Sequence, residues 1–357
     1  PYMEKAPVPY PPVLHSLASA STITWLIHQK FELSIPLYRQ EKEWEALGLR
    51  LSRATMSNWL LIVYRDWLVH IVHRLKLELL KQRYLHIDET HVQVLKEPGR
   101  KNTSDSYMWV YCSIRDAVNP IRYFEYQPGR SGKYPEAFLR EYEGYIHTDA
   151  YSGYNAVSGV KRCLCYTHLR RAFVDALPKD IHNSEASKPA EAILRLNQLF
   201  NIESELEALP PDQKKKERLI REKPLLEAFW SWAEKSAIGE LPKSKLSKAF
   251  HYALNNREGF WNYLEDGNCS ISNSLAENCI RPFVIGRKNW LFSGSPKGAE
   301  ASAGIYTLVE TAKANGLAPM KYIKYILSDM PGSAFLEHPE YLDDYLPWNP
   351  LVKEFCR

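Results

Sequence analysis

Residues 85–90 read Leu-His-Ile-Asp-Glu-Thr and place an acidic pair inside an apolar segment. The surrounding text from Tyr84 to Leu95 is rich in β-branched and aromatic residues, which predicts a strand. Side chains alternate along a strand, so Asp88 and Glu89 point to opposite faces and only one of them can join a given site. A carboxylate in a central strand is costly unless it is paired or binds a metal. Asp88 is therefore a candidate functional residue, and an acid at a cap or on an edge strand is the alternative.

The text after this strand predicts a mixed α/β sheet. Two more short runs, 107–114 and 120–126, are bounded by turn formers, so three successive antiparallel strands are expected. The next expected elements are a helix at 134–142, strands at 144–149 and 161–165, and a helix at 167–177. Strands followed by alternating strands and helices are typical of a mixed sheet covered by helices.

The text before the strands predicts helices. Gly48 ends one helix and Ser52 caps the next, whose first turns carry Arg53, Ser57 and Asn58. Such a helix-turn-helix unit can lay its second helix in a DNA major groove. A helical hairpin without DNA contact fits the local pattern equally well.

The remaining text divides the chain further. Residues 1–12 contain five prolines and predict an extended arm. Residues 189–263 predict helices, with the basic run 214–216 in a solvent-facing connection, and another long helix is expected at 299–314. The tail is expected to be irregular. The predicted regions are the arm and helix-turn-helix at 1–82, the first part of a catalytic core at 83–178, a helical insertion at 179–270, the second part of the core at 271–330, and the tail at 331–357.

Two more acids stand at informative positions. Asp149 ends the apolar strand 144–149, where α/β sheets present catalytic side chains, although Asp also commonly opens a turn. Glu277 lies on a predicted helix with Arg281 and Lys288 at offsets of four and eleven residues, so one carboxylate and two cations share a face. The alternative is structural, because Ser274 and Glu277 also fit a capping box.

Composition limits the class of protein. The 357 residues carry a formal net charge of only +4, so a basic surface must be local. The six cysteines form no paired CxxC signature, which predicts reduced thiols and no structural zinc. The apolar runs are too short to span a bilayer, so we expect a cytoplasmic protein that does not enter a membrane. A first residue of Pro indicates a processed product or a fragment.

Several motifs together resemble a known family. They are His86–Thr90 with Asp88, the segment Cys165–Phe173, and the segment Asn273–Asn278, which continues into Gly286–Phe292. The order of Asp88, Asp149 and Glu277 on strand, strand and helix resembles the acidic triad of DDE transposases and retroviral-type integrases. The longer motifs resemble insertion-sequence family sixty-six over most of the chain.

This resemblance implies an RNase H-like catalytic domain with flanking helices and a helical insertion. It implies that Asp88, Asp149 and Glu277 are catalytic and bind two Mg²⁺ or Mn²⁺ ions, because carboxylate oxygens suit these hard cations. The expected partners are double-stranded DNA at the element ends and at the target, further copies of the chain on that DNA, and small accessory transposition proteins. We expect association with the nucleoid when DNA is bound. A DNA-binding relative without catalysis and an RNase H-like nuclease are the alternatives.

Basic side chains near these motifs are candidates for phosphate contacts. They are Arg170, Arg171, Arg281, Arg287, Lys288 and Lys297. Trp290 is expected in core packing rather than base stacking. Cys165 and His168 lack a second pair of soft ligands, so we interpret them as packing and positioning residues rather than a zinc site.

The front of the chain departs from the family pattern. Family members usually begin with a helical coiled segment and a Cys-rich zinc-binding module that helps to recognise the element ends. Neither precedes Pro1, so recognition of the ends by this chain alone is not expected.

Overall fold

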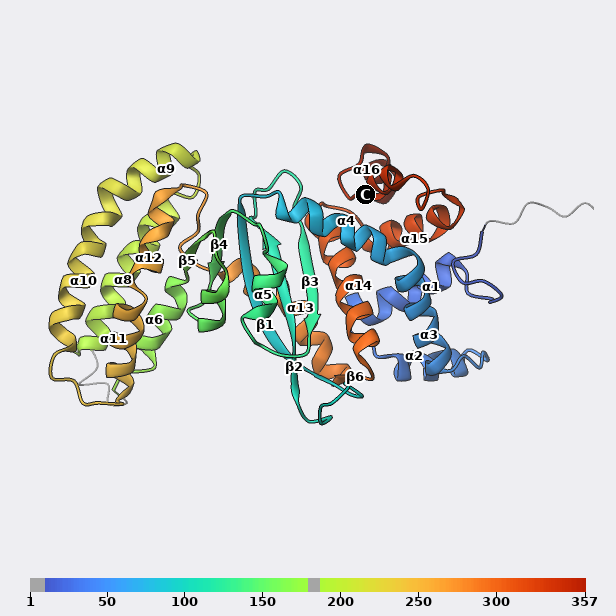
Figure 1. Ribbon diagram of the computed structural model, residues 1–357, viewed down its shortest axis with the longest axis horizontal. Helices are drawn as coiled ribbons and strands as arrows, with labels where there is room; N and C mark the ends of the chain where they lie inside the picture. Colours follow the sequence, from blue (N-terminus) through green and yellow to red (C-terminus); the bar gives the residue numbers. More distant parts are fainter. Residues whose placement is uncertain (1–9, 179–186) are drawn as a thin grey trace, which may run out of the picture. The chain divides into compact units, whose positions relative to one another are not determined.

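The computed structural model describes residues 10–178 and 187–357 (Figure 1). Most of the predicted proline-rich arm and the start of the predicted insertion lie outside the described residues. The chain divides into two compact units. The first comprises residues 1–82, 88–134 and 276–357, and the second comprises 83–87 and 135–275. Strand β1 (Tyr84–Val94) contributes residues to both.

The strands follow the order β3-β2-β1-β4-β5, and β6 also pairs with β1. The other strands are β2 (Asp105–Ser113), β3 (Arg122–Gln127), β4 (Gly144–Thr148), β5 (Val160–Leu164) and β6 (Phe292–Ser293). Strands β2 and β3 pair antiparallel, whereas β4 runs parallel to both β1 and β5. This mixed sheet is the RNase H-like arrangement that the sequence predicts.

Helix α14 (Pro296–Ala314) protects the edge of the sheet in the first unit. The hydroxyl oxygen of Thr307 accepts the amide N–H of Phe124 at 2.8 Å, and that of Thr311 accepts the amide N–H of Arg122 at 3.1 Å. An unpaired strand edge invites pairing with another chain, and side-chain acceptors satisfy these donors instead. Helix α14 therefore covers β3 and closes the sheet on that side (Figure 1).

The N-terminal helices confirm the expected boundaries closely. They are α1 (Ala20–Ile27), α2 (Leu37–Ala46), α3 (Arg53–Val63) and α4 (Val69–Leu80), with π-helical turns at His28–Glu32 and Tyr64–Leu68. Gly48 adopts a φ of 85° after α2, and the hydroxyl of Ser52 accepts the Thr55 amide N–H at 3.1 Å. Ser52 thus caps α3 as predicted. Among the described residues, every helix is too short or too polar to cross a membrane.

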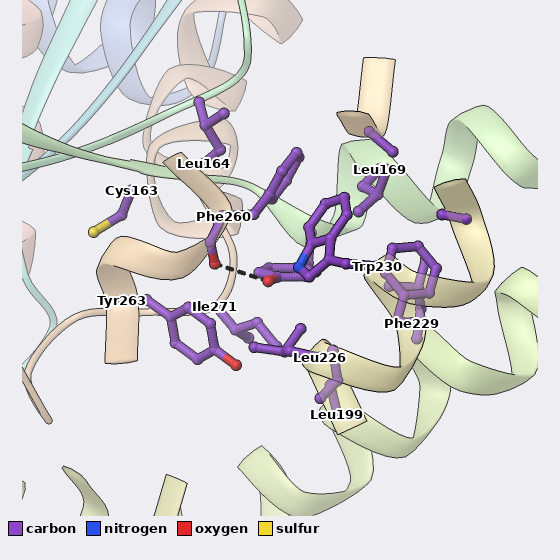
Figure 2. Packing of buried hydrophobic residues seen from close by; sticks show 14 of the residues in the cluster. Cys163, Leu164, Leu169, Leu199, Leu226, Phe229, Trp230, Phe260, Tyr263 and Ile271 are labelled. Carbon is purple, nitrogen blue, oxygen red and sulfur yellow. Dashed lines mark hydrogen bonds between the residues drawn. The ribbon is translucent and has the colours of Figure 1, made fainter. Parts of the chain in front are cut away.

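The second unit contains several helices, most of which pack on one another. They are α5 (Lys133–Phe138), α6 (Tyr166–Val174), α8 (Lys188–Glu205), α9 (Pro211–Glu217), α10 (Lys223–Ala237), α11 (Lys245–Asn255) and α12 (Arg257–Trp261). Figure 2 shows their buried cluster, in which Phe229, Trp230 and Phe260 meet Leu164 and Leu169. Residues 188–261 are thus largely helical, and they share one apolar core with β4, β5 and α6.

A buried cation organises this helical unit. Arg218 is fully buried and forms a two-pronged ion pair with Glu203, at 2.6 and 2.8 Å. Its remaining N–H groups reach the carbonyl oxygens of Tyr263, Asp266 and Cys269 at 2.8–3.1 Å. A buried charge is stable only when it is paired and its hydrogen bonds are satisfied, and Arg218 meets both conditions. It thereby ties the helices to the segment that precedes α13 (Ser274–Trp290).

Three expectations about local structure were wrong. The basic run 214–216 lies within α9. Pro211 starts this helix, because an amide N–H in the first turn has no partner within the helix and its absence in proline therefore costs no hydrogen bond. The tail is ordered into a 3-10 helix at Pro339–Tyr345 and α16 (Pro350–Cys356), which the Asn349 side chain caps. Helix α14 begins at Pro296, so Lys297 lies in its first turn rather than in a loop.

Helix α14 also passes close to Tyr64, which suggests a stability test. A Cβ at Gly304 would overlap the Tyr64 ring, whereas at Gly298 its nearest atom would be the Ser295 hydroxyl oxygen at 3.4 Å. We expect Gly304→Ala to lower the free energy of unfolding by about 1–3 kcal/mol through overpacking. The matched change Gly298→Ala should be neutral or stabilising, because Ala favours a helix by about 0.5–1 kcal/mol. Urea unfolding of both variants measures this, and equal stabilities would contradict the close packing.

Candidate active site

The first part of the site is the parallel pairing of β1 with β4. His86 lies opposite His147, and their rings stack with centroids 4.2 Å apart and planes 9° from parallel. Asp88 follows His86 by two residues in β1, and Asp149 follows His147 by two residues at the end of β4. Because side chains repeat every second residue, Asp88 shares the strand face of His86. Asp149 lies one residue past the end of β4, in the turn that follows it.

Asp149 lies in a turn that Arg162 holds. One carboxylate oxygen, Oδ1, accepts the Tyr151 amide N–H at 2.9 Å, so Asp149 does open a turn, as the alternative interpretation has it. The Arg162 guanidinium donates to the Thr148 hydroxyl and to the Asp149 and Tyr151 carbonyl oxygens at 2.6–2.8 Å. The turn at the end of β4 is therefore fixed by a side chain from β5. The sequence analysis missed Arg162, because only the β4–β5 register reveals its partners.

The neighbourhood of Asp88 in the first unit includes α13. Burial, a hydrogen bond with the Cys279 thiol and the nearby charge of Asp88 raise the pKa of Cys112 on β2. Cys279 follows Glu277 by two residues on α13. Farther along this helix, Arg287 donates to the Thr90 hydroxyl at 3.0 Å and to the His91 carbonyl oxygen. Helix α13 therefore runs along the part of β1 that begins with Asp88.

A single amide side chain ties the start of α13 to β1. Asn273 is almost fully buried, and its Oδ1 lies 3.0 Å from His86 Nδ1 while its Nδ2 donates to the Ile87 carbonyl oxygen at 2.7 Å. Its backbone N–H donates to the Cys165 sulfur at 3.2 Å. Glu277 follows one helical turn later. Asn273 lies within one of the sequence motifs, but the motif alone does not predict its role, because its partners lie far away in sequence.

Cys165 takes the positioning part that the sequence suggests. It precedes α6, and its sulfur accepts the Asn273 amide N–H. Burial raises its pKa, but hydrogen bonds from His168 and from the Asn273 amide outweigh burial and lower it overall. Trp290 likewise packs, edge to face, on Phe283 with ring centroids 5.3 Å apart. Its expected role in packing is confirmed.

The predicted DNA-contact residues lie on four helices, α3, α14, α13 and α6. Arg53 and Asn58 are exposed on α3, and Ser57 is half-buried there. Asn58 and Lys297 both line a cavity of about 580 Å³ whose other walls include Tyr64 and Arg65. The first unit thus brings one predicted contact of α3 together with one of α14.

The other basic residues differ in how far their side chains are exposed to solvent. Arg281 and Lys288 are exposed on α13, while Arg287 is half-buried and burial lowers its pKa. In the second unit, Arg171 is exposed in the last turn of α6, whereas the Arg170 guanidinium donates to the Asn197 side chain at 2.7 Å. Of these five residues, Arg281, Lys288 and Arg171 are the exposed ones.

Comparison with known proteins agrees with these motifs. The family model described as "Transposase IS66 family" matches residues 15–301. The chain is similar to three uncharacterized proteins of Sinorhizobium fredii (strain NBRC 101917 / NGR234): y4hP at 25% identity, y4qI at 28% and y4jD at 25%. These matches cover 97%, 93% and 97% of this chain, but 65%, 63% and 68% of the relatives. The chain therefore spans about two thirds of the length of these relatives. Since the family model covers most of its residues, the chain belongs to the IS66 transposase family.

Proposed function

We propose that the chain is the catalytic part of a DDE transposase, which cuts DNA at element ends and joins these ends to a target. Asp88, Asp149 and Glu277 act together as its catalytic carboxylates. The observation that carries this proposal is Asn273, which bonds to the backbone immediately before Asp88 and stands one helical turn before Glu277. Asp149 is included because it follows His147 by two residues, as Asp88 follows His86, and the two histidines are paired in the β1–β4 register.

The donor set fits the divalent cations that this family implies. Three carboxylates offer hard oxygen ligands, which suit Mg²⁺ or Mn²⁺. When bound, two such ions activate an attacking oxygen and stabilise the leaving oxygen. The protein supplies the carboxylate oxygens and holds the backbone that carries them. Arg162 fixes the turn of Asp149, and Asn273 fixes the start of α13.

The reaction proceeds in two displacements at phosphorus. In the first, a water oxygen bonds to the phosphorus at the element end, and the 3′ oxygen leaves as a free hydroxyl. In the second, the oxygen of that hydroxyl bonds to a phosphorus of the target DNA, the bond from this phosphorus to the target's own 3′ oxygen breaks, and that oxygen leaves as a hydroxyl with the proton released. Exposed Arg281 and Lys288, on the same helix as Glu277, hold the DNA phosphates. Neither step needs a covalent protein intermediate or ATP.

Helix α3 contributes to DNA binding in this proposal. Its first turns present the exposed side chains of Arg53 and Asn58, which are available to a groove. Action on paired ends also calls for more than one copy of the chain on DNA, together with small accessory proteins. A relative that only binds DNA and a nuclease without strand transfer are the competing functions, and joined products separate both from a transposase.

Neutral replacements of the carboxylates test catalysis. Asp88→Asn, Asp149→Asn and Glu277→Gln should each lower DNA cleavage and joining at least about a hundredfold in Mg²⁺, because an amide is a poor ligand for a hard cation. Folding and DNA binding should remain. The control is Glu265→Gln, since Glu265 is exposed and pairs with Lys161. Cleavage by Glu277→Gln within a few-fold of wild type would remove Glu277 from the set.

The salt dependence of DNA binding tests Arg281 and Lys288. Each phosphate contact contributes about 0.9 to the slope of log K against log salt concentration, so the double change to Gln should flatten the slope by about 2. The matched control replaces two exposed lysines of α11, Lys245 and Lys248, with Gln. A slope unchanged by the first pair, or flattened equally by both pairs, would contradict the assignment.

The role of Asn273 is tested by Asn273→Ala. This change leaves the Ile87 carbonyl and the His86 ring nitrogen without their buried partner, which should lower the free energy of unfolding by about 2–4 kcal/mol. The variant should also need more Mg²⁺ for half-maximal cleavage, an effect that lost stability alone would not produce. Asn278→Ala, at an exposed site on the same helix, is the control. Unchanged stability and Mg²⁺ dependence would rule out the positioning role.

A further inference from the structure

Three buried soft donors meet in the second unit, apart from the carboxylates. They are His147 on β4, Cys163 on β5 and Cys269 in the segment that precedes α13, each about 1% exposed. One ligand atom from each lies within 4.8 Å of the others. His147 and Cys163 are direct neighbours in the β4–β5 register. Figure 2 shows the Cys163 sulfur pointing away from the aromatic cluster around Trp230.

The His147 ring is oriented as a metal ligand requires. Its Nδ1 lies 3.2 Å from the Leu85 carbonyl oxygen, which can only accept, so Nδ1 carries the proton. Its Nε2 therefore presents a lone pair, and this accepts the Ser270 amide N–H at 2.8 Å. Ser270 follows Cys269 directly, so the lone pair points at the segment that holds the second thiol. Metal-binding histidines commonly donate their other N–H to a carbonyl in this way.

The charge balance of this cluster favours a divalent soft cation. A hydrogen bond with Cys163 and burial raise the pKa of Cys269, which keeps its thiol neutral while no cation is present. Two thiolates and one neutral imidazole would cancel the charge of Zn²⁺, and a buried site without net charge avoids the cost of an isolated ion. Thiolate and imidazole ligands select zinc over magnesium.

We propose that His147 Nε2, Cys163 Sγ and Cys269 Sγ bind one structural Zn²⁺. Binding releases the two thiol protons to solvent, and the Ser270 amide gives up its bond to Nε2. Zinc lies about 2.3 Å from sulfur and about 2.0 Å from nitrogen, so tetrahedral ligands stand about 3.5–3.8 Å apart. The three ligand atoms already lie within 4.8 Å of one another, so a contraction of about 1 Å at most brings them to these separations. The fourth position is left to a water molecule.

Such an ion would strengthen a link that the protein already makes. Arg218 donates to the Cys269 carbonyl oxygen at 2.8 Å, and Asn273 follows four residues later. Zinc would join this segment to β4 and β5 through metal–ligand bonds, in place of the hydrogen bond from Ser270 to His147. The inference concerns folding of the second unit and stands whether or not the proposed catalysis is correct.

Metal analysis of the purified full chain tests the site. After zinc loading and dialysis, elemental mass spectrometry should find about one zinc ion per chain. Cys163→Ser and Cys269→Ser should each lower this content at least about tenfold. The control Cys356→Ser removes another buried thiol, in α16, and should retain zinc. Wild-type protein without zinc, or loss of zinc in the control but not in Cys163→Ser, would overturn the proposal.

X-ray absorption of the zinc-loaded wild type keeps the test decisive if a variant fails to fold. Two sulfur neighbours at about 2.3 Å and an imidazole nitrogen at about 2.0 Å are expected. A shell of oxygen neighbours alone would assign the zinc to carboxylates and refute the cysteine site.

Discussion

The buried amide of Asn273 is the constraint on which the arrangement of the site depends. Its donor satisfies the Ile87 carbonyl, its acceptor holds the His86 ring, and its own backbone N–H is held by Cys165. An unmade bond at any of these buried groups would cost about 1–3 kcal/mol, so the amide favours one geometry strongly. The consequence is that the entry to α13 is fixed against the residue before Asp88. An acid on a helix can serve an acid on a strand only if such a constraint exists.

Around this amide, the protein repeatedly uses side chains to satisfy backbone groups that regular structure leaves open. Thr307 and Thr311 accept the outward amides of β3, Arg162 binds the carbonyls of the turn after β4, and Arg218 binds those of the segment before α13. These are the places where strands end or lie at an edge, and where polar backbone would otherwise be buried without partners. In the irregular segments near the carboxylates, side chains thus take the place of the hydrogen-bond partners that a sheet or helix would supply.

The sequence could predict features that depend on neighbouring residues, but not features that depend on long-range contacts. Local rules found the strands around Asp88 and Asp149, the cap at Ser52 and the stop at Gly48, because each depends on neighbours within a few residues. The ordered tail and the helical basic run were not predicted. Proline at the first turn is typical of both helices, but the high charge and proline content of these segments is also typical of loops. Asn273 and Arg162 could not be assigned. Their partners lie 7 to 187 residues away, and only the fold defines them.

The same strand pair also separates two kinds of ligand chemistry. In β4, His147 is buried with its ring between β1 and the segment of Cys269, while Asp149 stands beyond the end of the strand. Soft donors are thereby enclosed among apolar and sulfur-containing neighbours, where a neutral thiol is favoured over a free ion. The Asp149 carboxylate lies one residue past the strand end, where it is half-buried. The proposed zinc ligand His147 and the proposed magnesium ligand Asp149 thus stand two residues apart, one inside the strand and one past its end, and the two proposals assign a soft cation to the first and hard cations to the second.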